Sequence, residues 1–154
     1  MKPVGALEWS ALVVRVLLGT WFVYSGGMKL WGSGLDRFTL DIANYQLVQQ
    51  PLDAWVAYTV PWFELVAGFC LVLGIWLRGA LITIAGMVLG FVVFVGWAWA
   101  HGLDISCGCT GSGKPIHYWG KAAEFALYVV LLAALWRMED RRQASAGQNL
   151  QNMA

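Results

Sequence analysis

The sequence predicts an all-α membrane protein built as a bundle of four transmembrane helices. Of its 154 residues, 59% are hydrophobic and 12% are charged, whereas soluble domains have roughly 25% charged residues. The mean hydropathy is +0.61, so the chain has too little polar surface to cover itself in water. Ten tryptophans, which favour the lipid headgroup boundary, agree with this class. The net charge of +1 gives no electrostatic reason to expect nucleic acid as a partner.

Four segments are long and apolar enough to cross the hydrocarbon core of a bilayer, which takes about 20 helical residues. They are residues 7–30, 54–77, 80–100 and 118–136. None has the alternation that is typical of a membrane β-barrel strand. The first follows Lys2 as a secretory signal would, but Arg15 interrupts it and no small-residue cleavage site follows. We therefore interpret it as a retained helix.

The connections between these segments differ in length. The link around Arg78–Gly79 is very short, which predicts a tight antiparallel hairpin of the second and third helices. The first outer loop, residues 31–53, has apolar side chains at helical spacing with polar ones between them. This pattern predicts a short helix in the membrane interface. The apolar positions are Leu35, Phe38, Ile42 and Tyr45.

Positive residues predict the orientation of the bundle. In a four-helix topology, one side of the membrane receives Lys2, Arg78, Arg137, Arg141 and Arg142. The positive-inside rule then places both termini in the cytoplasm. Residues 1–142 form one transmembrane domain, and the polar tail 143–154 is expected to be a disordered cytoplasmic segment.

Small residues predict where helices approach each other. Gly86 and Gly90 form a G-x-x-x-G pair in the third segment, and Gly19, Gly26 and Gly68 lie in the first two. Helix association in lipid depends on close backbone packing, so we expect these glycines at helix contacts. Cys70, in the middle of the second helix, is expected to be a packing residue.

Cys107-Gly108-Cys109 is the motif that points most directly to chemistry. The two cysteines lie in the glycine-rich second outer loop, 101–117, and Gly108 allows the chain to fold between them. Their Cα atoms can reach the separation of about 4.4–6.8 Å that a disulfide needs. So small a ring is expected to be strained, and strained disulfides tend to be labile and oxidising. The predicted topology places the pair outside the cytoplasm, where disulfides persist.

Two other interpretations of this motif stay open. The cysteines could form an inert clip or remain unpaired. Alternatively, two thiolates together with His101 or His117 could bind copper(I) or zinc.

Charged residues inside the predicted helices are the second candidate site. A charged side chain costs at least about 2.5–3.5 kcal/mol inside a bilayer, so it persists where it is paired or functional. From the helical rise, Lys29, Glu64, Lys121 and Glu124 are expected to converge beneath the cysteine loop, with Arg15 deeper on the cytoplasmic side. Such a network either holds the bundle together or tunes the thiols and passes protons.

Several short motifs in order resemble the DoxX/MauE family. They are Arg15-x-x-x-Gly19, Ser25-Gly-Gly-Met-Lys29-Leu, Pro61-x-x-Glu64-x-x-x-Gly68 and Cys107-Gly-Cys109-x-Gly111. The outer Cys-Gly-Cys favours the MauE branch, which is associated with methylamine utilisation.

The resemblance implies a four-helix protein of the bacterial inner membrane. MauE-like proteins are linked to disulfide formation or maturation of periplasmic partners, often beside a thioredoxin-like protein. DoxX-like relatives are linked to quinone-connected sulfur oxidation, so a quinone is a candidate acceptor, although the cofactor is unknown.

The chain offers no second outward dithiol, so it must reach its acceptor directly or depend on another protein. We therefore expect a redox protein, a thiol-disulfide oxidoreductase if it is an enzyme, with Cys107 and Cys109 as the reactive pair. The alternatives are a non-catalytic membrane anchor or assembly subunit of a redox complex, and a copper- or zinc-binding membrane protein.

Overall fold

The computed structural model describes residues 6–48, 50–103 and 117–151, and the regular structure in these ranges is entirely helical. The predicted all-α class is confirmed. The helices are α1 (Ala6–Gly27), which continues as the π-helical turn η1 (Met28–Gly32), α2 (Leu35–Ala43), α3 (Leu52–Leu73), α4 (Leu77–Ala100) and α5 (Tyr118–Gln151).

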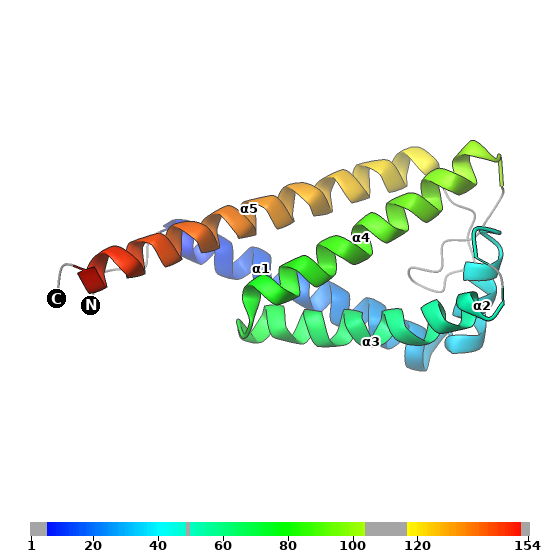
Figure 1. Cartoon of the computed structure of the whole chain (residues 1–154), viewed down its shortest axis with the longest axis horizontal. Helices are drawn as coiled ribbons and strands as arrows, with labels where there is room; N and C mark the ends of the chain where they lie inside the picture. The colour runs from blue at the N-terminus through cyan, green and yellow to red at the C-terminus, as the bar shows by residue number, and fades with distance from the viewer. Residues whose placement is uncertain (1–5, 49, 104–116, 152–154) are drawn as a thin grey trace.

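The four long helices lie side by side in an elongated bundle, and the short α2 lies across one end (Figure 1). In that view α1 lies along α3, while α4 lies between α3 and α5. We call the end that holds α2 the α2 end. The opposite end, which holds the α3–α4 turn, the start of α1 and the end of α5, is called the hairpin end.

Four helices in the described part of the chain are long and apolar enough to cross a membrane: Trp9–Gly32, Leu52–Leu73, Leu77–Ala100 and Tyr118–Ala144. Their outward faces carry many exposed large apolar side chains, which lipid can cover. Several exposed tryptophans, among them Trp31, Trp76 and Trp119, lie near helix ends, where the indole ring suits the headgroup boundary. The chain is a multi-pass membrane protein.

Three glycines bring α1 and α3 into close contact. A Cβ atom placed on Gly19 would lie 2.8 Å from the carbonyl oxygen of Gly68, and one on Gly68 would lie 2.8 Å from that of Gly19. A Cβ on Gly26 would meet the carbonyl oxygen of Pro61 at 2.8 Å. The predicted packing role of Gly19, Gly26 and Gly68 is therefore confirmed.

The prediction for Gly86 and Gly90 is wrong. Apart from the backbone of α4 itself, no atom of the described residues lies within 4 Å of a Cβ built on either glycine, so no described helix packs closely against them. Both glycines instead line a cavity between α2, α3 and α4. The G-x-x-x-G spacing on α4 therefore leaves an open space beside this helix instead of a helix contact.

The hairpin turn lies earlier than predicted. Helix α3 ends at Leu73, and the next residue, Gly74, has a left-handed φ of 76°. The N–H groups of Gly74 and Ile75 both donate to the carbonyl oxygen of Cys70. Glycine adopts this conformation without a steric penalty, so it commonly ends helices. Arg78, which the sequence placed in the turn, lies in the first turn of α4.

Helix α5 extends well beyond its predicted end at residue 136, and the expectation of a disordered tail from residue 143 is wrong for residues 143–151. The segment after Trp136 is rich in helix-forming Arg, Met, Glu, Gln and Ala. Gln143 donates to the Glu139 carboxylate at 3.0 Å. An ion pair of 2.6 Å between Arg78 and Asp140 also ties this part of α5 to α4.

The short helix predicted in the first outer loop is present as α2. Its apolar face packs on the bundle, with Phe38 and Ile42 buried against α3 residues such as Ala57. Helix α2 therefore packs against both α3 and α4 at this end of the bundle.

Candidate functional site

The reactive pair predicted from the sequence, Cys107 and Cys109, lies outside the described residues. The flanks of its segment are described. The hydroxyl of Tyr118, at the start of α5, donates to the carbonyl oxygen of Leu103, just after α4. Both flanks pack in one cluster with Tyr45, which follows α2. The residues on either side of the segment 104–116 are therefore held together at the α2 end of the bundle.

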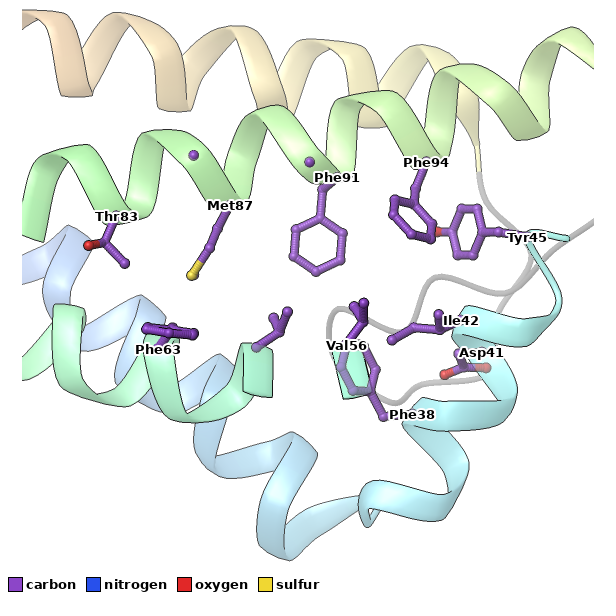
Figure 2. Close-up of a pocket in the computed structure, with 13 residues that line it drawn as sticks. Phe38, Asp41, Ile42, Tyr45, Val56, Phe63, Thr83, Met87, Phe91 and Phe94 are labelled. Atoms are coloured by element: carbon purple, nitrogen blue, oxygen red, sulfur yellow. The ribbon is translucent and has the colours of Figure 1, made fainter. Parts of the chain in front are cut away.

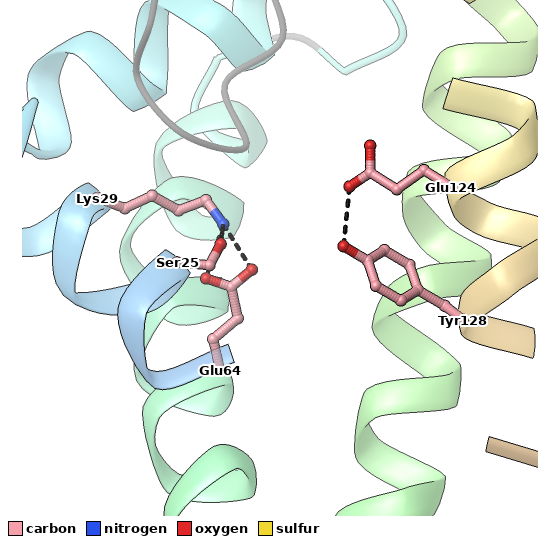
Figure 3. A network of polar contacts seen from close by, with 5 residues as sticks. All are labelled: Ser25, Lys29, Glu64, Glu124 and Tyr128. Atoms are coloured by element: carbon pink, nitrogen blue, oxygen red, sulfur yellow. Dashed lines mark hydrogen bonds and ion pairs between the residues drawn. The ribbon is translucent and has the colours of Figure 1, made fainter. Parts of the chain in front are cut away.

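A fully buried ion pair joins η1 to α3. Lys29 Nζ lies 2.5 Å and 2.7 Å from the two carboxylate oxygens of Glu64, and it also donates to the Ser25 hydroxyl at 3.0 Å (Figure 3). The side chains of Lys29 and Glu64 are 1% and 2% exposed. Three acceptors therefore satisfy the three donors of the ammonium group.

Aromatic rings enclose the ammonium group. The Nζ atom of Lys29 lies 5.2 Å from the ring centroid of Phe38 on α2 and 5.5 Å from that of Phe91 on α4. Both distances allow cation–π attraction, which strengthens where water is excluded. Lys29 thus brings together groups from α1, α2, α3 and α4.

A second polar cluster lies on α5. Lys121 Nζ lies 2.6 Å from Glu124 Oε2, and the Tyr128 hydroxyl donates to Glu124 Oε1 at 2.8 Å. Lys121 and Glu124 are 18% and 32% exposed, so this cluster is less buried than the Lys29–Glu64 pair.

The two clusters face one small cavity of about 40 Å³, lined by Lys29, Glu64, Glu124 and Tyr128 among others. Figure 3 shows Glu64 and Lys29 on one side and Glu124 with Tyr128 on the other. The four converging charges predicted from the sequence are thus arranged as two ion pairs. Lys29, Glu64 and Glu124 reach the shared cavity, and Lys121 joins through Glu124.

Arg15, which was predicted as a deeper part of this network, lies apart from it. It is 14 residues before Lys29 in sequence, which is about 21 Å along a helix. Its guanidinium group lies against Gly74 at the hairpin end, where a Cβ on Gly74 would be 2.8 Å from Nη1.

The histidines proposed as alternative metal ligands are placed as follows. His101 directly follows α4, and its Nδ1 lies 2.9 Å from the carbonyl oxygen of Trp97. The centroids of the two rings are 4.0 Å apart, and the rings are tilted by 30°. The exposed His117 precedes α5. Among the residues that the structure describes, no three His, Cys, Asp or Glu side chains are grouped as metal ligands. Because Cys107 and Cys109 are outside that set, the metal-site alternative stays untested.

A larger apolar cavity of about 360 Å³ lies between α2, α3 and α4 (Figure 2). Aromatic side chains from all three sides point into it, including Phe38, Phe63, Phe91 and Phe94. Gly86 and Gly90 on α4 also line it and leave space between these side chains. Asp41 is the acidic group on its lining. Phe38 and Phe91 also contact Lys29, so they separate this cavity from the buried ion pair.

Sequence reasoning missed Ser25, Tyr128, Phe38 and Phe91. A local signal existed for two of them, because Ser25 precedes Lys29 by four residues and Tyr128 follows Glu124 by four. Side chains at that spacing lie on the same face of a helix. No local signal existed for Phe38 or Phe91, which reach Lys29 from other helices.

A comparison with protein families finds a match to the family described as methylamine utilisation protein MauE over residues 7–138. This range holds both polar clusters, both cavities and the Cys107-Gly-Cys109 motif. No curated protein and no solved structure matches the chain significantly.

Proposed function

The chain belongs to the methylamine utilisation protein MauE family, and on this premise we propose that it is a membrane redox protein that exchanges disulfides through Cys107 and Cys109. The partner is a soluble protein with a thioredoxin-like or maturation role. Both belong to a bacterial inner membrane and its periplasmic side, with the α2 end facing outward. Family membership agrees with the MauE branch of the resemblance, while the link to DoxX stays a prediction.

The observation that best supports this proposal is that both flanks of the cysteine segment lie at the end of the bundle where the buried charges lie. Tyr118 and Leu103 hold its two flanks together. On the same side, Lys29 and Glu64 form an ion pair within the membrane-spanning part. Ionisable groups inside a membrane are expensive and commonly functional.

In the proposed exchange, the partner's two thiols become a disulfide and the Cys107–Cys109 disulfide becomes two thiols. Two electrons and two protons therefore pass to this chain. For the next cycle the pair must lose them again. We assign the release of protons to the two polar clusters, whose shared cavity of about 40 Å³ exceeds the roughly 10–15 Å³ that one water needs.

The proposed electron acceptor is a membrane quinone, which takes two electrons and two protons and becomes a quinol. The cavity of about 360 Å³ between α2, α3 and α4 is a suitable site for its ring, because small-molecule sites are typically about 300–1,000 Å³ and mostly apolar. Four phenylalanines line it, and aromatic rings favour offset stacking on a flat ring.

Trapping of the partner tests the exchange. With Cys109 changed to Ser, the Cys107 thiolate attacks the disulfide of the oxidised partner and releases the partner's other cysteine as a thiol. The variant has no second cysteine beside Cys107 to resolve the new bond, so a mixed disulfide should accumulate in membranes. The reciprocal Cys107→Ser variant tests the other cysteine, and Cys70→Ser is the matched control that should behave as wild type. If the double Cys107→Ser, Cys109→Ser variant fully supports the native pathway, the anchor or assembly subunit is the correct interpretation.

Filling the larger cavity tests the acceptor separately. Gly90→Leu places a side chain in the cavity, whereas Gly96→Leu on the same helix enters a different hollow, between α4 and α5. Reduced protein in liposomes should reoxidise on addition of a quinone in the wild type and in Gly96→Leu, and more slowly in Gly90→Leu. Equal rates in all three would exclude this cavity while leaving the disulfide exchange intact.

A further inference from the structure

Arg15 is a charged side chain in a membrane-spanning helix that has no polar partner among the described residues. No described side chain or backbone atom forms a hydrogen bond or ion pair with it, and its buried Nε has no acceptor. The guanidinium group has five donors and stays charged. This differs from Lys29, whose donors are all satisfied.

A second arginine lies beside Arg15. Arg15 and Arg142 line the same hollow between α1, α4 and α5, together with Glu139. Glu139 accepts a hydrogen bond from Gln143. Its carboxylate does not come within the roughly 4 Å of the Arg15 guanidinium group that an ion pair requires. The remaining lining is apolar: Ala11, Leu12, Leu77, Leu135 and Met138. The hollow is thus lined by two positively charged side chains and by an apolar wall.

The position of the hollow suggests which anion it meets. It lies at the hairpin end, where the apolar part of α5 passes into its charged part, as at the level of lipid headgroups. Its volume of about 30 Å³ is too small to enclose a ligand, but it can receive the oxygens of a group lying along the surface. The apolar wall can contact the attached acyl chains.

We propose that Arg15 and Arg142 bind the phosphodiester of an anionic phospholipid at the hairpin end of the bundle. The planar guanidinium group matches two phosphate oxygens at once, and basic pockets between transmembrane helices bind anionic headgroups. Two cations against the single carboxylate of Glu139 leave the hollow with a net positive charge. This site is independent of the cysteine pair and of the proposed function.

Another arginine at the same end provides a matched control. Arg78 is about half exposed, pairs with Asp140 at 2.6 Å, and lies over the Trp136 ring at 5.7 Å. Its charge is therefore already matched by a carboxylate of the chain. Removing it changes the net charge as much as removing Arg15 does.

The test measures phospholipid binding to the full-length protein by native mass spectrometry, titrating phosphatidylglycerol or phosphatidylcholine into detergent-purified protein. We expect phosphatidylglycerol to bind the wild type more tightly than phosphatidylcholine. Arg15→Gln should weaken phosphatidylglycerol binding about tenfold or more, as the loss of a charge-assisted contact implies, and Arg78→Gln should leave it within about twofold. Arg142→Gln, in the polar part of α5, should also weaken it and covers the case in which Arg15→Gln fails to fold.

Three results would overturn the proposal. One is equal affinity for the two lipids in the wild type. Another is an equal loss of binding in Arg78→Gln and the two other variants, which would indicate net charge alone. The third is displacement of the lipid by millimolar inorganic phosphate, which would indicate a site for a soluble anion.

Discussion

Lys29 and Glu64 depend on each other because both are removed from solvent. Each is less than 3% exposed, and the ammonium group is surrounded by Glu64, Ser25 and two aromatic rings. A buried ion pair is weak evidence for net stability, since desolvation opposes the attraction. Removing one member of the pair is nevertheless strongly destabilising, because the remaining buried charge then has no counterion.

The first prediction concerns this pair. Glu64→Gln leaves the Lys29 charge buried without its counterion, a change that costs about 3–5 kcal/mol in soluble proteins. Asp140→Asn breaks the Arg78–Asp140 pair, whose members are 45% and 48% exposed, so it should cost about 0–1 kcal/mol. Chemical unfolding in detergent micelles measures both variants. Equal loss of stability in the two would show that burial of Lys29 and Glu64 does not govern the outcome.

The sequence predicted this pairing at the level of residues because a charge within a long apolar segment requires a partner. The same argument predicted a deeper place in the network for Arg15, but no described residue forms an ion pair with it. Helical rise gives depth along a helix, but it does not give the direction of a side chain around that helix. Arg15 lies about four helical turns from Lys29 and faces Gly74 instead.

At the scale of elements, the closest contact is the crossing of α1 with α3. It depends on Gly19 and Gly68, each of which has the other's carbonyl oxygen where a Cβ would be. This crossing sets the distance between the two helices that supply Lys29 and Glu64. The position of Lys29 relative to Glu64 thus depends on the Gly19–Gly68 backbone contact, which lies further along the same two helices.

The second prediction tests that crossing. A methyl group on Gly68 would lie 2.8 Å from the Gly19 carbonyl oxygen and 3.0 Å from the Val23 nitrogen, so the backbone of one helix must move. Gly68→Ala should destabilise the protein by about 1–3 kcal/mol, as overpacking does. A Cβ on Gly96 would have no atom of the described residues within 4 Å beyond the backbone of its own helix. Gly96→Ala should therefore be neutral or stabilising, because alanine favours a helix. The free energy of unfolding of both variants is measured in the same detergent. A stabilising effect of Gly68→Ala would refute the close contact between α1 and α3.

Element boundaries were predictable to the extent that apolar length and local chemistry determine them. The start of α5 and the presence of α2 were predicted from residue spacing, and both are confirmed. The hairpin turn was misplaced because Arg78 suggested a polar turn, whereas Gly74 ends α3 through its left-handed conformation. Gly86 and Gly90 were misassigned because a small-residue spacing does not reveal whether a neighbour fills the space beside it.

At the scale of the whole molecule, the bundle is polarised. Among the described arginines, Arg15, Arg78 and Arg142 lie at the hairpin end. Arg37 lies on α2 at the other end, together with the flanks of the cysteine segment. This arrangement agrees with the positive-inside rule if the hairpin end is cytoplasmic. Fold class and the order of helices were predictable because lipid demands long apolar helices. The cavities were not, since they depend on how side chains from three helices meet.

The third prediction concerns this orientation. After mild reduction of intact cells, a membrane-impermeant maleimide should label Cys107 or Cys109. Cys70→Ser removes the remaining native thiol from this measurement. In a second variant, with Cys70, Cys107 and Cys109 all changed to Ser, a cysteine introduced in place of Gln148, at the hairpin end, should react only after the cells are lysed. The reverse pattern would mean that the bundle is inverted, and the proposed periplasmic partner would then be wrong.

The measurement that tests the central claim most directly is an alkylation-shift titration of Cys107 and Cys109 in membranes, across a series of glutathione redox buffers. A small strained ring should favour reduction relative to structural disulfides, which typically lie below about −300 mV. We therefore predict a two-electron transition above about −300 mV, and a shift of the pair to the oxidised form when a quinone is added. A pair that stays oxidised at every potential down to that value, or that never forms a disulfide, would contradict the account.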